Sequence, residues 1–187
     1  MGQIIIEGKQ YDVIDVIKAP GRQHLHLINA TKTIKIGDGA HLIIDQLNRL
    51  NSSRNHSVEH LIQHALQTVI DKNIKQEGAF KSAEKVSFDY HYHVKLSDQQ
   101  IAQVQAKVNE YIKDGFKVQT KIMSLDEAKK AGAIAYFEDT YSKLGKDLRV
   151  VCMGDVSMEI CGGTHVNKIS DIEQFLILKI DNKGSGS

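Results

Sequence analysis

The stretch Asn55–Ile70, NHSVEHLIQHALQTVI, predicts the helix around which the rest of the chain is organised. Its apolar residues recur at the i, i+3, i+4 and i+7 spacing of an amphipathic helix. They are Val58, Leu61, Ile62, Ala65, Leu66 and Val69. His56 and His60 fall nearly opposite that stripe, one turn apart and off the packed face. Two imidazoles placed in this way can converge on one metal ion.

A second motif, Cys161-Gly-Gly-Thr-His165, can supply the remaining ligands of such a site. A cysteine, a histidine and a double glycine suit a tight turn that brings backbone and ligands together. The chain has nine histidines, however, and His60 and His64 repeat the spacing of His56 and His60. Spacing therefore leaves the histidine pair open. It also leaves open whether four ligands make a structural zinc site, or three ligands and a water make a hydrolytic one.

The composition is that of an ordinary globular protein. The 187 residues are 41% hydrophobic, which suffices for the core of one domain or of two lobes. With 24 basic and 23 acidic residues the net charge is +1, so the strongly basic field of a dedicated nucleic-acid binder is missing. No apolar run approaches the roughly 20 residues that span a bilayer, and no signal peptide is recognisable. We therefore expect a cytoplasmic protein without a membrane segment, with both cysteines reduced.

The first fifty residues have a β-pattern. Four runs rich in β-branched and apolar residues are separated by turn signals. The runs are Ile4–Ile6, Tyr11–Ile17, His24–Ile28 and His41–Ile44. Four strands at this spacing predict an antiparallel sheet or part of a barrel. We expect residues 1–50 to form a partial antiparallel β-barrel lobe, incomplete because the chain starts inside its first strand.

Residues 51–183 alternate helical and strand patterns. We expect Gln46–Asn55 to be a polar connection before the first helix, and capping boxes at Ser97–Gln100 and Ser124–Glu127 to open two more helices. Strand patterns fall at Ile74–Phe80, Lys85–Val94, Phe116–Ile122, Leu148–Cys152, Ser157–Ile160 and Phe175–Ile180. This order predicts the α+β class and a two-layer α/β sandwich with its helices on one face. The last residues, 184–187, are a linker-like tail.

These motifs together resemble the editing domain of alanyl-tRNA synthetase and its free-standing relatives, the AlaX proteins. NHSVEHLIQHAL is similar to the family's HTATHLL helix, and SMEICGGTHV to its S-x-E-x-CGGTHV motif. Between them KQEGAF, VSFDYHYH, LSDQQI and MSLDEAKKAGAIAYFEDTY follow in the family's order. The resemblance implies a zinc-dependent editing domain, from residue 51 to residue 183. We expect it to be part of a longer synthetase chain, and a short free-standing editor is the alternative.

The resemblance also implies the residues of the site. The positions that match the family's zinc ligands are His56, His60, Cys161 and His165. Ser57 stands where the family usually has a pocket threonine, Gln76 matches a glutamine near the pocket, and Thr164 keeps the turn. We take these three as candidates to bind a serine hydroxyl or to assist catalysis. For a general base, Asp89 and Glu159 are the carboxylates considered.

The activity implied by the resemblance is hydrolysis of Ser-tRNA(Ala), and to a lesser degree of Gly-tRNA(Ala), at the acceptor end. A pocket sized for alanine rejects neither glycine nor one added hydroxyl strongly, so a second hydrolytic site is needed. The alternatives are a non-catalytic, zinc-stabilised tRNA-docking module and an editing domain of the threonyl-tRNA synthetase type. ATP binding would belong to the parent synthetase, since no such motif occurs here. The basic residues expected to contact RNA are Arg49, Arg54, Lys72, Lys75, Lys81 and Lys85.

The chain departs from the family pattern outside the zinc ligands. Ser87 stands where the family's RFDFSH motif has its arginine, and Ile169–Phe175 lacks the glycines of TGEIGxF. The family's GGQ-x-x-D-x-G segment is reduced to Gly2-Gln3. The departures therefore concern the pocket and the first lobe, whereas the four metal-binding positions are intact.

Overall fold

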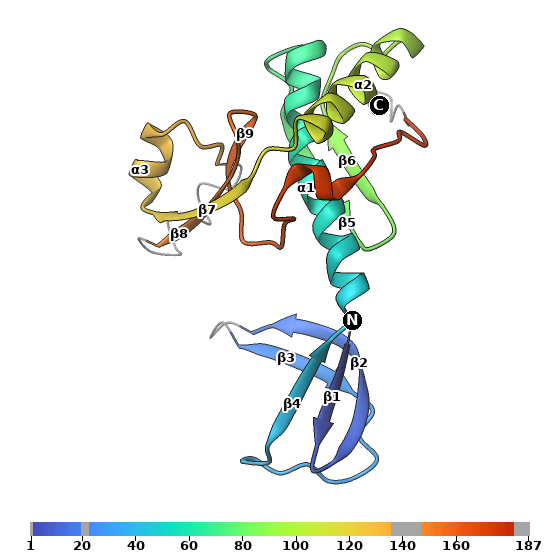
Figure 1. The fold of residues 1–187 in the computed structure, drawn as a ribbon, viewed down its shortest axis with the longest axis vertical. Helices are drawn as coiled ribbons and strands as arrows, with labels where there is room; N and C mark the ends of the chain where they lie inside the picture. Colours follow the sequence, from blue (N-terminus) through green and yellow to red (C-terminus); the bar gives the residue numbers. More distant parts are fainter. Residues whose placement is uncertain (1, 20–22, 136–146, 182–187) are drawn as a thin grey trace. The chain divides into compact units, whose positions relative to one another are not determined.

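The computed structural model describes residues 2–19, 23–135 and 147–181, and these residues form a mixed α+β fold with three antiparallel sheets (Figure 1). The α+β class is therefore confirmed. Contacts between residues divide the chain into two compact units, Met1–Leu50 and Asn51–Ser187. No helix among the described residues has the length and apolar character required to cross a membrane.

The first unit is a four-stranded antiparallel sheet. Its strands are β1 (Gly2–Ile6), β2 (Lys9–Lys18), β3 (His24–Ile28) and β4 (Ala40–Ile44), in the order β3-β2-β1-β4. All four predicted strands are present. Glu7 and Gly8 join β1 to β2 with φ values of 47° and 74°, the left-handed backbone that a tight two-residue hairpin turn requires. Within the described part of this unit, the outer strands β3 and β4 pair with no further strand, so closure into a barrel is not seen.

Helix α1 extends over Gln46–Val69, so the prediction of a polar connection at Gln46–Asn55 is wrong. The helix starts earlier because Asp45 caps it. The backbone N–H of Asn48 donates to Asp45 Oδ1 at 2.9 Å, and that of Arg49 donates to the Asp45 carbonyl oxygen at 3.0 Å. A carboxylate that takes up the free N–H groups of a first turn is a strong N-cap.

The middle of α1 is buried on both its apolar and its polar side. Leu61 and Ala65 are fully buried, as predicted, but His56 and His60 are also only 8% and 4% exposed. The histidines lie opposite the apolar stripe, as predicted, but that side of the helix is packed as well. Polar groups on such a helix need partners within the protein, because unpaired buried polar groups destabilise the fold.

A hairpin and a second helix pack with α1. Strands β5 (Gln76–Lys81) and β6 (Val86–Tyr90) pair with each other and, among the described residues, with no other strand. Strand β6 ends well before the predicted Val94. Helix α2 (Asp98–Asp114) has the predicted capping box at Ser97, and it ends at Gly115 with φ 65°. Val104, Val108, Tyr111 and Ile112 of α2 join the apolar side of α1 in the main core.

The remaining strands form a separate three-stranded sheet in the order β7-β8-β9. They are β7 (Val118–Met123), β8 (Leu148–Met153) and β9 (Ser157–Ile160), and helix α3 (Leu125–Lys130) opens with the predicted capping box at Ser124 (Figure 1). A 3₁₀ turn, η1 (Ile169–Ile172), follows. Cys152 on β8 is a buried free thiol, as predicted.

The predicted last strand at Phe175–Ile180 is wrong. Its backbone pairs with side chains of α2 instead of with a strand. The N–H of Phe175 donates to Asn109 Oδ1 at 2.9 Å, and the Asn109 amide donates to the Phe175 carbonyl at 2.8 Å. The N–H of Ile177 donates to Gln105 Oε1 at 2.8 Å. These amides take the hydrogen bonds that a neighbouring strand would provide.

Candidate metal centre

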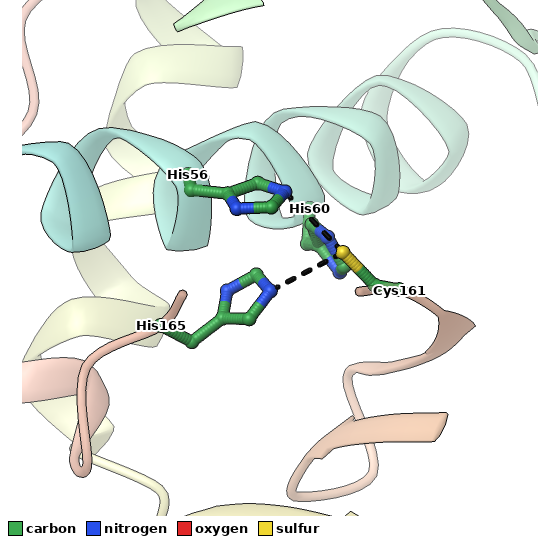
Figure 2. Close-up of side chains that lie close together, drawn as sticks. All are labelled: His56, His60, Cys161 and His165. Carbon is green, nitrogen blue, oxygen red and sulfur yellow. Dashed lines mark hydrogen bonds between the residues drawn. The ribbon is translucent and has the colours of Figure 1, made fainter. Parts of the chain in front are cut away.

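Four side chains from α1 and from the loop after β9 converge on one point, as Figure 2 shows. They are His56, His60, Cys161 and His165, and their ligand atoms all lie within 4.8 Å of one another. The Cys161 sulfur is 3.3 Å from His56 Nε2 and 3.4 Å from His165 Nε2. A tetrahedral zinc ion with ordinary Zn–N and Zn–S bonds would set these atoms about 3.5 Å apart. The donor set therefore fits a metal ion.

His64, the rival of His56 in the sequence pattern, lies outside this cluster. Its ring packs 5.6 Å from the ring of Tyr111, measured between centroids. The helical period explains the difference, because residues i and i+4 share a face and each further step turns that face slightly. The structure therefore brings together the pair His56 and His60.

The loop that carries Cys161 and His165 is held by Arg149 of β8. The Arg149 guanidinium donates to the carbonyl of Cys161 at 2.8 Å and to that of Gly163 at 2.7 Å. Gly163 itself lies against His56, and a Cβ atom added there would be 1.9 Å from His56 Cε1. A side chain at this position would occupy the space of the imidazole ring, so the second glycine of the motif has a steric reason.

Two of the three imidazoles face a side chain on the side turned away from the cluster. Ser57 Oγ is 3.1 Å from His165 Nδ1, and it also accepts a hydrogen bond from the backbone N–H of Val166 at 3.2 Å. His60 Nδ1 faces Glu159 Oε1 at 3.4 Å, close enough for an ion pair but without the geometry of a hydrogen bond. A metal ion on Nε2 of His165 and of His60 would leave their protons on Nδ1, directed at Ser57 and at Glu159. Outer partners of this kind orient metal-binding histidines.

Burial sets the protonation of the cluster. It lowers the pKa of His56 to about 4, that of His60 to about 3 and that of His165 to about 2, with neighbouring positive groups adding to the effect. Neutral imidazoles are the form that binds metal. Burial also raises the pKa of Cys161. The thiol therefore stays protonated at neutral pH unless a cation stabilises the thiolate, as a metal ion does.

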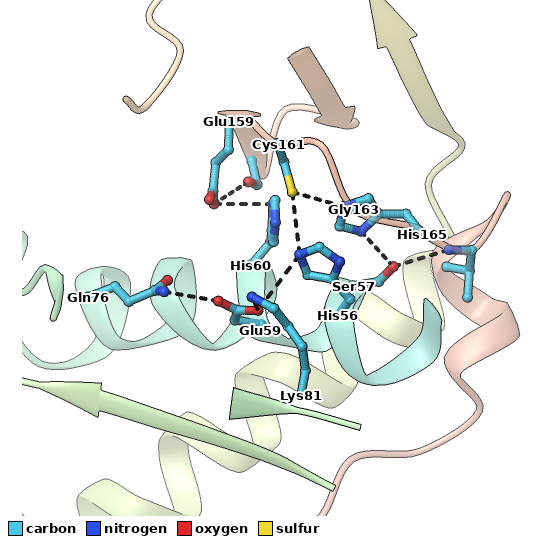
Figure 3. Close-up of polar contacts among 12 residues, drawn as sticks. His56, Ser57, Glu59, His60, Gln76, Lys81, Glu159, Cys161, Gly163 and His165 are labelled. Carbon is cyan, nitrogen blue, oxygen red and sulfur yellow. Dashed lines mark hydrogen bonds and ion pairs between the residues drawn. The ribbon is translucent and has the colours of Figure 1, made fainter. Parts of the chain in front are cut away.

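A buried carboxylate, Glu59, lies beside the cluster (Figure 3). Its Oε1 accepts a hydrogen bond from Gln76 Nε2 at 3.0 Å, and its Oε2 is 2.5 Å from Lys81 Nζ. Oε2 also lies 3.8 Å from His56 Nε2, the same nitrogen that faces the Cys161 sulfur. Gln76 and Lys81 therefore hold Glu59 in place beside the cluster.

Sequence reasoning missed Glu59 and Arg149, and it placed some residues in other roles. Glu59 could have been found from the sequence, because His56-Ser-Val-Glu59-His60 has the H-x-x-E-H spacing of a class of zinc hydrolases. No sequence motif identifies Arg149, since its contacts to the loop are to backbone carbonyls. Of the basic residues predicted to contact RNA, Arg54 donates to the Asp171 carbonyl at 2.7 Å and pairs with Glu173, so it is engaged within the protein.

Comparison with known proteins assigns the class. Residues 148–187, which include β8, β9 and the CGGTH loop, match the family model for the threonyl and alanyl tRNA synthetase second additional domain. The alanine–tRNA ligase of Ureaplasma parvum serovar 3 is 42% identical over 186 residues, which is 100% of this chain and 20% of that protein. The alanine–tRNA ligase of Malacoplasma penetrans is 43% identical over 178 residues, 95% of this chain and 19% of its own length.

The chain therefore belongs to the alanyl-tRNA synthetase family and corresponds to its editing region. The alanine–tRNA ligase of Acholeplasma laidlawii agrees, with 39% identity over 175 residues and 94% of this chain. The chain spans about a fifth of the length of these relatives, 20% in the Acholeplasma protein.

Proposed function

We propose that this chain hydrolyses the ester bond of Ser-tRNA(Ala), and of Gly-tRNA(Ala), with a zinc ion held by His56, His60, Cys161 and His165. One observation carries the proposal: three neutral imidazoles and a thiol converge within 4.8 Å in an alanyl-tRNA synthetase editing region. We place this activity in a longer, cytoplasmic synthetase that binds the acceptor end of tRNA(Ala).

When bound, zinc would polarise the ester carbonyl or make a water molecule reactive at neutral pH. The chain's own residues hold the reacting groups. Ser57 already contacts His165 and Val166, so we assign it to the orientation of His165 rather than to the substrate. Thr164 is exposed at the turn, and its hydroxyl is the candidate to bind the serine side chain. Gln76 fixes Glu59.

The test is deacylation of Ser-tRNA(Ala) by the chain with zinc present, compared with Ala-tRNA(Ala). We expect faster loss of serine than of alanine, and loss of both zinc and activity in Cys161→Ala. Ester loss at the buffer rate would refute the proposal. Zinc at full occupancy in Cys161→Ala would refute the ligand assignment.

A complete set of four protein ligands also favours a second candidate function, because such sites are usually structural. In that case the chain is a zinc-stabilised module that docks tRNA without cutting it. Chelation would then lower the melting temperature, whereas mischarged tRNA would stay intact with zinc present. Ser-tRNA(Thr) as substrate tests the threonyl type, which the matched family model also covers.

A further inference from the structure

Glu59 is an unusual residue for its position. It is only 3% exposed, and it belongs to α1 between two of the candidate metal ligands. A buried carboxylate is costly unless it is paired and hydrogen-bonded. Lys81 and Gln76 provide that pairing, one on each carboxylate oxygen. The protein thus holds a buried, hydrogen-bonded carboxylate at the edge of the metal cluster.

The helix directs this carboxylate at the cluster. Residues i, i+3 and i+4 share one helical face, so Glu59 must point to the same side as His56 and His60. Its Oε2 is 3.8 Å from His56 Nε2, and that nitrogen is 3.3 Å from the Cys161 sulfur. A separation of 3.8 Å is too long for a direct hydrogen bond, so Glu59 Oε2 faces the cluster without being bonded to His56.

The other carboxylate of the site is placed differently. Glu159 accepts a hydrogen bond from Ser157 Oγ at 2.8 Å and faces the outer nitrogen, Nδ1, of His60. It therefore lies behind a ligand, where it can orient the imidazole. Glu59 lies instead beside the nitrogen that faces the cluster. In the H-x-x-E-H hydrolases, the glutamate at this spacing accompanies two zinc-binding histidines.

We propose that Glu59 is the general base of the editing reaction. Glu59 Oε2 takes a proton from a water molecule, while the water oxygen forms a bond to the ester carbonyl carbon. The carbon then releases the ribose oxygen, which receives the proton back from Glu59, so that serine and free tRNA are formed. Lys81 and Gln76 each hold one oxygen of the carboxylate, which makes both positioning residues. This inference rests on the proposed deacylase function.

The test is Glu59→Gln, which keeps the shape of the side chain but removes the base. Removal of a general base typically lowers a rate roughly 10²- to 10⁴-fold, and we expect such a loss in single-turnover deacylation of Ser-tRNA(Ala). Zinc per chain, the absorption spectrum of the cobalt-loaded protein and the affinity for an amide-linked seryl acceptor should remain those of wild type. Glu110→Gln, on the exposed side of α2, is the matched control and should keep the full rate.

A second variant guards against loss of folding. Glu59→Asp keeps the charge and the pairing with Lys81 but withdraws the oxygen by one methylene, and a misplacement of about 1 Å can cost on the order of 10²-fold. Wild-type rates in either folded variant would overturn the assignment of Glu59 and leave the deacylase function standing. Loss of zinc in Glu59→Gln would overturn it in favour of a ligand role. A wild-type chain without activity would overturn both proposals.

Discussion

Gly163→Ala tests whether the metal site is built by close contact between the CGGTH loop and α1. The added Cβ atom would lie 1.9 Å from His56 Cε1 and 2.3 Å from His56 Nδ1, much closer than carbon and ring atoms can approach. Either the ring or the loop must move. In the metal-free protein the ring can turn aside, whereas bound metal fixes His56 in place. The free-energy cost of the added methyl group therefore falls on the metal-bound state.

The size of the effect follows from that difference. Overpacking a well-packed site costs about 1–3 kcal/mol, and if the metal-bound state alone bears this cost, zinc affinity falls about 5- to 150-fold. Competition with a chromophoric chelator measures the affinity. The neighbouring Gly162→Ala is the matched control, because nothing lies within 4 Å of a Cβ atom at that position.

Two results would refute the reasoning. Wild-type zinc affinity in Gly163→Ala would show that the loop does not need this contact. An equal loss in Gly162→Ala would show that flexibility of the double glycine, and not space beside His56, is what matters. The melting temperatures of the metal-free variants should differ little from that of wild type. A large drop would show that the added methyl group destabilises the fold itself and not only the metal-bound site.

Three further predictions concern the protonation of the site. Glu159→Gln weakens the orientation of His60, so zinc affinity should fall about 10- to 100-fold; an unchanged affinity in the same chelator assay would contradict the contact. The lowered pKa values of His56, His60 and His165, caused first by burial, mean that below pH 6.5 the unfolded chain binds protons that the folded metal-free chain does not. The free energy of unfolding of the metal-free chain should therefore fall as the pH is lowered from 6.5 to 4.5. The raised pKa of Glu159, about 7, has the opposite effect in this range and cancels the contribution of one histidine. A melting temperature that rises on acidification would be inconsistent with buried neutral imidazoles. Because burial raises the pKa of Cys161, zinc binding at pH 7.5 should release a proton from its thiol, and calorimetry in buffers of different ionisation enthalpy should detect it.

The features that sequence alone predicted correctly are those with local causes. The capping boxes at Ser97 and Ser124 are present because each involves residues only three positions apart. The four strands of the first unit are likewise present, since turns such as Glu7-Gly8 mark their ends. Periodicity also found the buried apolar side of α1. Short-range chemistry decides each of these elements.

The features that sequence missed depend on distant partners. The polar side of α1 is buried because a loop 105 residues further along packs on it, and helical periodicity contains no information about that contact. The segment Phe175–Ile180 has the alternation of a strand, but Asn109 and Gln105 of α2 take its backbone hydrogen bonds. In both cases the residue types suited the local prediction, and tertiary contacts decided the outcome.

The candidate site is itself divided between a local and a distant part. His56, Ser57, Glu59 and His60 lie on one helix, so backbone hydrogen bonds within α1 fix their mutual spacing. Cys161 and His165 have no such internal support, and the contacts of Arg149 and Gly163 hold their loop against the helix. Substitutions in the helix should therefore change the chemistry of the site, whereas substitutions under the loop should decide whether the site forms at all. The proposed roles of Glu59 and Gly163 fall on opposite sides of this division.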